Sequence, residues 1–140
     1  MNRRNFLAGM SGTLVASSWL HGQSAGAGID LKNSVVVVPG NATAREKNAA
    51  NVLIEEVEKR SQLRWKTQPA GGRVTGAAIY AGTRSSAHAF GSRIASATKA
   101  AARLSADGYS IQTGKDGDGD WIAVIGADER GLLFGIGSLL

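Results

Sequence analysis

The sequence predicts an α/β (α+β) domain in which helices pack on a mixed β-sheet in two layers, in the order β-α-β-β-α-β-β-α. Four consecutive valines at 35–38 are typical of a buried strand. Apolar residues recur at helical spacing in two later segments. Residues 121–140 combine a β-branched strand, a glycine and an apolar helix. Alternating strands and helices are the pattern of such layered domains.

Composition fits one domain behind a targeting segment. The chain has 140 residues, of which 43% are hydrophobic, enough for a packed core. The absence of cysteine excludes disulfides, thiolate metal sites and a cysteine nucleophile. Arg3 and Arg4 are two of the 16 basic residues, so the other 14 face 11 acidic residues and leave +3 of the +5 net charge. This balance, without a basic stripe, disfavours nucleic-acid binding.

Residues 1–27 are predicted to be a twin-arginine signal peptide. Its motif residues are Arg3, Arg4, Phe6 and Leu7. The apolar run that follows ends at Leu20 and is too short and too polar to span a bilayer. Ala25 and Ala27 form a small-residue cleavage site. We therefore expect residues 28–140 to be a mature domain without a membrane anchor, exported to the periplasm or the medium.

The first helix is predicted over residues 43–60. Thr43 and Glu46 form a capping box, in which each side chain binds a backbone amide at the helix start. The residues that fall on one face are Ala50, Leu53, Ile54 and Val57. Alternation over 63–67 then predicts a strand with Leu63 and Trp65 inward.

The middle of the chain is predicted to hold a strand, a helix and another strand. The strand covers 77–81 and ends at Gly82, after a loop at 69–72. Ser85 or Ser86 is expected to cap the helix. The apolar stripe of this helix consists of Phe90, Ile94, Ala97, Ala101 and Leu104. A turn at 107–108 leads into a strand over 109–113.

The last helix follows the strand at 121–125, with Gly126 ending the strand and Asp128 capping the helix. Its apolar residues surround it on nearly every side: Leu132, Leu133, Phe134, Ile136, Leu139 and Leu140. One sheet covers only one side of a helix. Covering about 300 Å² of the remainder would contribute roughly 7 kcal/mol. We therefore expect the chain to be the front part of a longer protein.

Two glycine-rich stretches do not match the ligand-binding motifs that they resemble. Counted from Asp116, an EF-hand would need glycine at Trp121 and glutamate at Ala127, so the stretch 116–120 is interpreted as a long hairpin turn, with weak ion binding left open. The spacing from Gly126 to Gly131 lacks the lysine of a phosphate loop. Gly131 and Gly135 lie four residues apart on one face of the helix, which favours close packing on the sheet.

No catalytic, cofactor-binding or metal-binding residue is predicted. His88 is the only histidine after the signal peptide and is expected at the surface. No serine lies in a nucleophile elbow. The acidic residues lie on a helix surface or in a turn, whereas sugar hydrolysis needs two carboxylates in one cleft.

Residues 34–140 resemble the non-catalytic N-terminal domain of α-glucuronidases and β-N-acetylhexosaminidases, two types of glycoside hydrolase. The resemblance is strongest in 107–111 and 122–135, with further similarity in 49–63 and 79–83. The positions that carry it are Gly108, Tyr109, Gly126, Asp128, Arg130, Gly131 and Leu132. It implies a small α/β domain that packs on a C-terminal catalytic barrel, which holds the catalytic acids.

The leading hypothesis is therefore an accessory domain of an exported, carbohydrate-degrading glycoside hydrolase. One alternative is a stand-alone carbohydrate-binding module, which would need exposed aromatic residues. The aromatic residues in predicted strands are Trp65, Tyr80, Tyr109 and Trp121, and core packing is their usual role. A second alternative is a structural or partner-docking domain.

Overall fold

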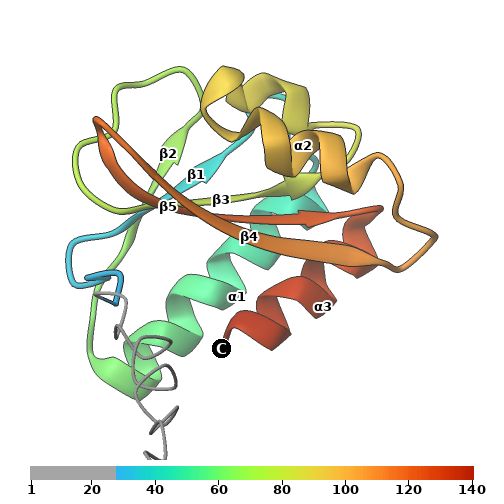
Figure 1. The fold of residues 1–140 in the computed structure, drawn as a ribbon. Coiled ribbons are helices and arrows are strands. Elements are labelled where there is room, and N and C mark those ends of the chain that lie inside the picture. The colour runs from blue at the N-terminus through green and yellow to red at the C-terminus, as the bar shows by residue number, and fades with distance from the viewer. Residues whose placement is uncertain (1–27) are drawn as a thin grey trace, which may run out of the picture.

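The computed structural model describes residues 28–140, so the predicted signal peptide lies outside the described residues (Figure 1). Five strands form one sheet in the order β2-β1-β3-β5-β4, in which only β4 is antiparallel to its neighbour. The strands are β1 (Val35–Val38), β2 (Lys66–Pro69), β3 (Ala78–Thr83), β4 (Tyr109–Asp116) and β5 (Gly119–Gly126). The α-helices are α1 (Ala44–Ser61), α2 (Ala95–Ala101) and α3 (Glu129–Leu139).

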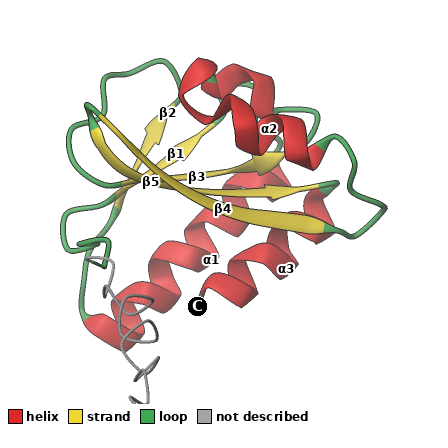
Figure 2. Cartoon of the chain, in the orientation of Figure 1, coloured by secondary structure: helices red, strands yellow, loops and turns green. Residues whose placement is uncertain are grey.

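The α/β class and the mixed sheet are confirmed. Helices α1 and α3 cover one face of the sheet and α2 covers the other, so the layers run helix, sheet, helix, one layer more than expected (Figures 1 and 2). The strands alternate between the two faces: Val36 and Val38 belong to the core cluster under α1, whereas Val37 belongs to the cluster on the opposite face. Burial of the valine run on both faces of the sheet requires a helix layer on each side.

The predicted start of α1 is confirmed. The Thr43 hydroxyl accepts a hydrogen bond from the Glu46 amide (3.2 Å), and the Glu46 carboxylate accepts one from the Thr43 amide (2.7 Å). Ala50 and Leu53 are fully buried against the sheet. The helix ends where Gln62 adopts a left-handed conformation, with φ of 60°.

The strand predicted over 63–67 is wrong in its boundaries, because β2 begins only at Lys66 and includes Pro69. Residues after Gln62 instead form the exit from α1. Trp65 is buried as expected, and its indole N–H donates a hydrogen bond to the Leu31 carbonyl (2.7 Å). It lies one residue before β2 and is not part of the strand. β2 is an edge strand, where a proline is tolerated.

The second helix is shorter than predicted. Two 3₁₀ turns, Ala87–Phe90 and Ser92–Ile94, precede α2, and Gly91 separates them with φ of 78°. No serine side chain caps this segment, because the Ser86 hydroxyl binds Glu46 instead. Four residues of the predicted stripe are nevertheless buried and Leu104 packs beside them.

Two glycine-containing boundaries also differ from the prediction. Gly82 lies inside β3, where the Phe90 ring passes within about 3.0 Å of the position that a Cβ would take. The acidic stretch is a tight hairpin rather than a long turn: Asp116 pairs with Gly119, and only Gly117 and Asp118 form the turn. Within residues 28–140, no helix combines the length and apolarity needed to cross a membrane.

Candidate functional site

The turn between β5 and α3 is held by one aspartate. The Asp128 carboxylate accepts hydrogen bonds from the amide of Asp107 and from the amide of Gly131, both at 2.8 Å. The first bond fixes the turn at 107–108. The second bond caps the N-terminus of α3, as predicted. These two donors hold the pKa of Asp128 below its usual value. Asp128 therefore joins two segments that lie 21 residues apart.

Glycine is required where these two segments touch. The Gly108 carbonyl accepts a hydrogen bond from the Ala127 amide (2.7 Å), and a Cβ on Gly131 would overlap that same carbonyl oxygen. One helical turn later, a Cβ on Gly135 would lie 2.7 Å from Val124 Cγ1. The predicted close approach of α3 to the sheet is confirmed.

The other residues of this motif surround the contact. Leu132 is fully buried in the core under α3, and Gly126 ends β5 so close to α3 that its own Cβ would lie 2.5 Å from the Asp128 carbonyl oxygen. Tyr109 pairs with Gly126 across the sheet, and its hydroxyl shares a 2.6 Å hydrogen bond with Ser138. Arg130 is exposed and lies 3.5 Å from Asp107.

Glu46 has a second role that its capping-box pattern does not predict. It is 1% exposed, and its carboxylate also accepts hydrogen bonds from the Thr83 amide (2.9 Å), the Thr83 hydroxyl (2.7 Å) and the Ser86 hydroxyl. Burial raises the pKa of Glu46, but the donors from Ser86, Thr43 and Thr83 outweigh burial and leave the pKa below its usual value. Every carboxylate bond is internal, so Glu46 is a structural group that ties α1 to β3.

Large apolar side chains reach the surface around α3. Among the described residues, the most exposed large ones are Leu133 and Phe134 on α3 (47% each), Val52 on α1 (40%) and Tyr109 on β4 (38%). The outward-facing apolar residues expected on the last helix are therefore present. All four belong to α3 or to elements next to it.

A groove of about 410 Å³ runs between α1 and α3. We call it the α1/α3 groove; its main lining residues are Arg45, Asn48, Val52, Glu129, Arg130 and Leu133. The N-termini of the two helices meet at one end, where Glu129 accepts a hydrogen bond from the Thr43 hydroxyl (2.6 Å) and pairs with Arg45 (3.2 Å). The groove thus has an apolar floor and exposed guanidinium groups at its rim.

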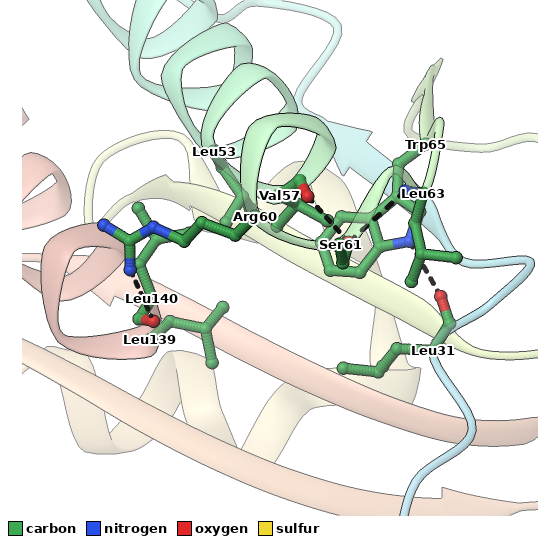
Figure 3. Close-up of a pocket in the computed structure, with 9 residues that line it drawn as sticks. All are labelled: Leu31, Leu53, Val57, Arg60, Ser61, Leu63, Trp65, Leu139 and Leu140. Atoms are coloured by element: carbon green, nitrogen blue, oxygen red, sulfur yellow. Dashed lines mark hydrogen bonds between the residues drawn. The ribbon is translucent and has the colours of Figure 1, made fainter.

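A smaller apolar pocket of about 240 Å³ lies at the other end of these helices (Figure 3). Leu53, Val57, Leu63, Trp65 and Leu139 contribute to its wall. At its edge, Arg60 donates a hydrogen bond to the Leu140 carbonyl (2.9 Å), which fixes the end of α3 against α1. This ion-to-carbonyl contact offsets the negative end of the helix dipole.

The other residues weighed from the sequence are not brought together. His88 is exposed, as predicted. Trp65, Tyr80 and Trp121 are at most 7% exposed and are therefore unavailable as a sugar-stacking platform. Within residues 28–140, no three histidine or acidic side chains gather closely enough to hold a metal ion.

The salt bridge between Arg93 and Asp116 was not anticipated from sequence. Arg93 binds Asp116 through Nε (2.7 Å) and Nη2 (3.1 Å), and also donates to the Tyr80 hydroxyl (3.1 Å). Burial lowers the pKa of Arg93, but Asp116 and Tyr80 outweigh it and raise the pKa above its usual value. The bridge joins the α2 layer to the β4–β5 hairpin, so Asp116 serves as an ion-pair partner.

Comparison with known proteins agrees with this geometry. A search of curated proteins finds no match. Residues 30–139 match the family described as the glycosyl hydrolase family 67 N-terminus, which spans every strand and helix of the domain. The chain therefore belongs to the glycosyl hydrolase family 67 N-terminal domains, the N-terminal domains of α-glucuronidases.

Proposed function

We propose that this chain is the non-catalytic N-terminal part of an exported α-glucuronidase that acts on carbohydrate polymers or oligosaccharides. Membership of the family makes it an accessory domain of a glycoside hydrolase. The match over residues 30–139 carries the proposal, because it includes the whole sheet and all three helices. The catalytic carboxylates belong to a C-terminal barrel in the same parent chain, by analogy with the family.

The acidic residues of the domain support a non-catalytic role. Glu46 is buried and fully hydrogen-bonded, and Asp128 caps a helix. Asp116 is held by Arg93 and Glu129 by Arg45. Glycoside hydrolysis needs one carboxylic acid and one carboxylate facing a common cleft. Each of these four side chains is held by hydrogen bonds or an ion pair within the domain.

The test is activity of the full-length protein encoded by the gene. We expect it to release glucuronic acid from oligosaccharides that carry an α-linked glucuronosyl group, and residues 28–140 alone to release none. Release of β-linked N-acetylhexosamine instead would assign the parent to the other type of hydrolase. A reading frame without a catalytic domain, or a full-length protein inactive on both substrates, would contradict the proposal.

Export is tested separately, on the motif residues Arg3 and Arg4. Replacing both by lysine keeps the positive charge, and we expect it to retain the precursor in the cytoplasm, because the twin-arginine pair itself is read as the address. A matched control replaces Asn2 and Asn5, which flank the pair, by glutamine and should leave export unchanged. Normal export of the double-lysine variant would contradict the twin-arginine route.

A further inference from the structure

A pocket of about 360 Å³ opens at the carboxyl ends of β1 and β2. In open sheets of parallel strands, ligands bind in the crevice beyond these ends, where the strand order reverses. That reversal lies between β1 and β3, and here the buried Glu46 and Thr83 fill it. Open space remains on the other side of β1, and we call it the β1/β2 pocket. Its main lining residues are Pro39, Lys47, Asn51, Thr67, Gln68 and Pro69.

The walls of the β1/β2 pocket are fixed by hydrogen bonds within the domain. The Ala70 amide donates to the Val38 carbonyl (2.9 Å), which holds the end of β2 against the end of β1. The Gln68 side-chain amide donates to the Arg73 carbonyl (3.2 Å), so its side-chain oxygen is left as an acceptor for a ligand. Pockets for small molecules are largely preformed and measure roughly 300–1,000 Å³. The β1/β2 pocket meets both conditions.

Among the described residues that line the β1/β2 pocket, Lys47 is the only charged one. It lies near the N-terminus of α1, where the helix dipole disfavours a cation. Its ammonium group forms no ion pair within residues 28–140, whereas Lys59 on the same helix pairs with Glu56 (2.9 Å). Helix stability therefore does not account for a lysine at this position, and its charge is available to an anionic ligand.

The other groups of the β1/β2 pocket suit a sugar. Asn51 lies one helical turn after Lys47 on the same face of α1, and Thr67 faces them from β2. Their amide and hydroxyl groups both donate and accept hydrogen bonds, as sugar hydroxyls do. Pro39 and Pro69 add an apolar wall for the C–H groups of a sugar ring. A single cation matches one carboxylate, whereas a phosphate ester carries about two negative charges.

We propose that the β1/β2 pocket binds a hexuronate residue of an acidic oligosaccharide. Lys47 pairs with the carboxylate, and Asn51 and Thr67 bind ring hydroxyls. This inference deepens the proposed function and rests on it for the choice of a sugar as the ligand. Binding here would hold an acidic polymer to the enzyme and raise its effective concentration at the catalytic domain of the same chain.

Lysine acetylation of the full-length protein, mapped by mass spectrometry, tests the pocket directly. The probe is methyl β-glucuronoside, and its matched control is methyl β-glucoside, which lacks only the carboxylate. At about ten times the concentration for half protection, the glucuronoside should slow acetylation of Lys47 about tenfold. Lys99, exposed on α2, should react at an unchanged rate. Equal protection of Lys47 by the glucoside, or by acetate as a carboxylate without a sugar, would overturn the proposal.

Removal of one amide tests whether the sugar hydroxyls are recognised. Asn51→Ala leaves the Lys47 signal in place, and alanine favours the helix. We expect it to raise the glucuronoside concentration for half protection about fivefold, because one hydrogen bond to the sugar is lost. Asn48→Ala, an exposed change on α1 outside the pocket, is the matched control and should leave this concentration unchanged. Equal values for the two variants would overturn the assignment of Asn51.

The outcomes separate this inference from the proposed function. A full-length protein that is an active hydrolase, but whose Lys47 is not protected by the glucuronoside, overturns the pocket and leaves the proposed function standing. Lys47 that is unreactive without any ligand means that another part of the protein covers the pocket, which also overturns the inference. A full-length protein inactive on both types of substrate contradicts the proposed function itself, whatever the reactivity of Lys47.

Discussion

The two faces of the sheet are covered in different ways. On the α2 face, Ala97 and Ala101 lie flat against the sheet with no exposed surface, and Phe90 and Ile94 fill the space beside them. On the α1/α3 face, Leu132 and Ile136 are buried, but their neighbours Leu133 and Phe134 are half exposed. The first face is complete within residues 28–140. The second carries more apolar surface than the sheet can bury, with Leu133, Phe134 and Val52 at 40–47% exposure.

Close packing of α3 gives the largest expected effect. Gly131→Ala would place a methyl group on the Gly108 carbonyl, so α3 must shift away from the turn at 107–108. We expect a loss of about 3 kcal/mol in unfolding free energy, measured by urea denaturation of residues 28–140. Gly137→Ala is the matched control on the same helix, since its methyl group meets nothing within 4 Å. That change should stabilise the domain by about 0.5–1 kcal/mol. Equal effects would show that the close contact between α3 and the turn at 107–108 does not contribute to stability.

The buried carboxylate that joins α1 to the start of the α2 layer gives the next effect. Glu46→Gln keeps the shape but turns one acceptor into a donor that faces the donors from Thr83, Ser86 or Thr43. We expect a loss of about 2 kcal/mol in unfolding free energy. Glu55→Gln, on the exposed side of α1, is the matched control and should change little. An unchanged stability for Glu46→Gln would mean that the network contributes nothing.

The same residue sets a pH dependence. The pKa of Glu46 is lower in the folded protein than its ordinary value of 4.5, so the unfolded chain binds the proton first as the pH falls. The stabilisation is complete above pH 4.5 and is lost as the pH falls through the lower, folded-state pKa. The difference in unfolding free energy between the unsubstituted domain and Glu46→Gln should shrink across that acid range. A constant difference would contradict the assignment.

Local signals in the sequence predicted the parts of the fold that depend on neighbouring residues. The capping box at Thr43, the Asp128 cap and the glycine contacts of α3 each involve a pattern readable within a few residues, and each is confirmed. Trp65 was expected to be buried and is, although its strand is displaced, because the alternating pattern reports burial and not hydrogen-bond pairing. Strand order had no such local signal.

The parts that sequence reasoning missed depend on contacts between distant residues. Glu46 meets Thr83 and Ser86 across 37 and 40 residues, and this contact removes Ser86 from the capping role expected of it. Gly91 lies inside the segment predicted as the second helix, and its positive φ interrupts that helix in the structure. The sequence contains this glycine, but the apolar stripe continues on both sides of it and favours a single helix. The α1/α3 groove was anticipated only as excess apolar surface, and its arginine rim required the position of α1 beside α3.

The bridge that closes the α2 face gives a smaller effect. Arg93→Lys keeps the charge but cannot make the two parallel bonds to Asp116 together with the bond to Tyr80. We expect a smaller loss of stability than for Glu46→Gln, and faster amide exchange in the hairpin at 116–119. Arg103→Lys, which is exposed, is the control. Unchanged hairpin exchange would show that this face does not need the bridge to remain closed.

The smallest effect on stability is expected for the exposed apolar side chains of α3, the feature in which the two faces differ most. Leu133→Gln with Phe134→Gln removes the two most exposed apolar side chains of α3, which the domain alone does not bury. Unfolding free energy of residues 28–140 should therefore change by less than about 0.5 kcal/mol for each substitution. Binding of a hydrophobic dye, and self-association of the fragment, should nevertheless fall sharply. Ala95→Gln with Ala102→Gln, at exposed positions of the α2 layer, should change neither property. Dye binding that persists in the first variant would place the dye-binding apolar surface elsewhere on the domain. A large loss of stability would mean that Leu133 and Phe134 already support the fold of the isolated domain.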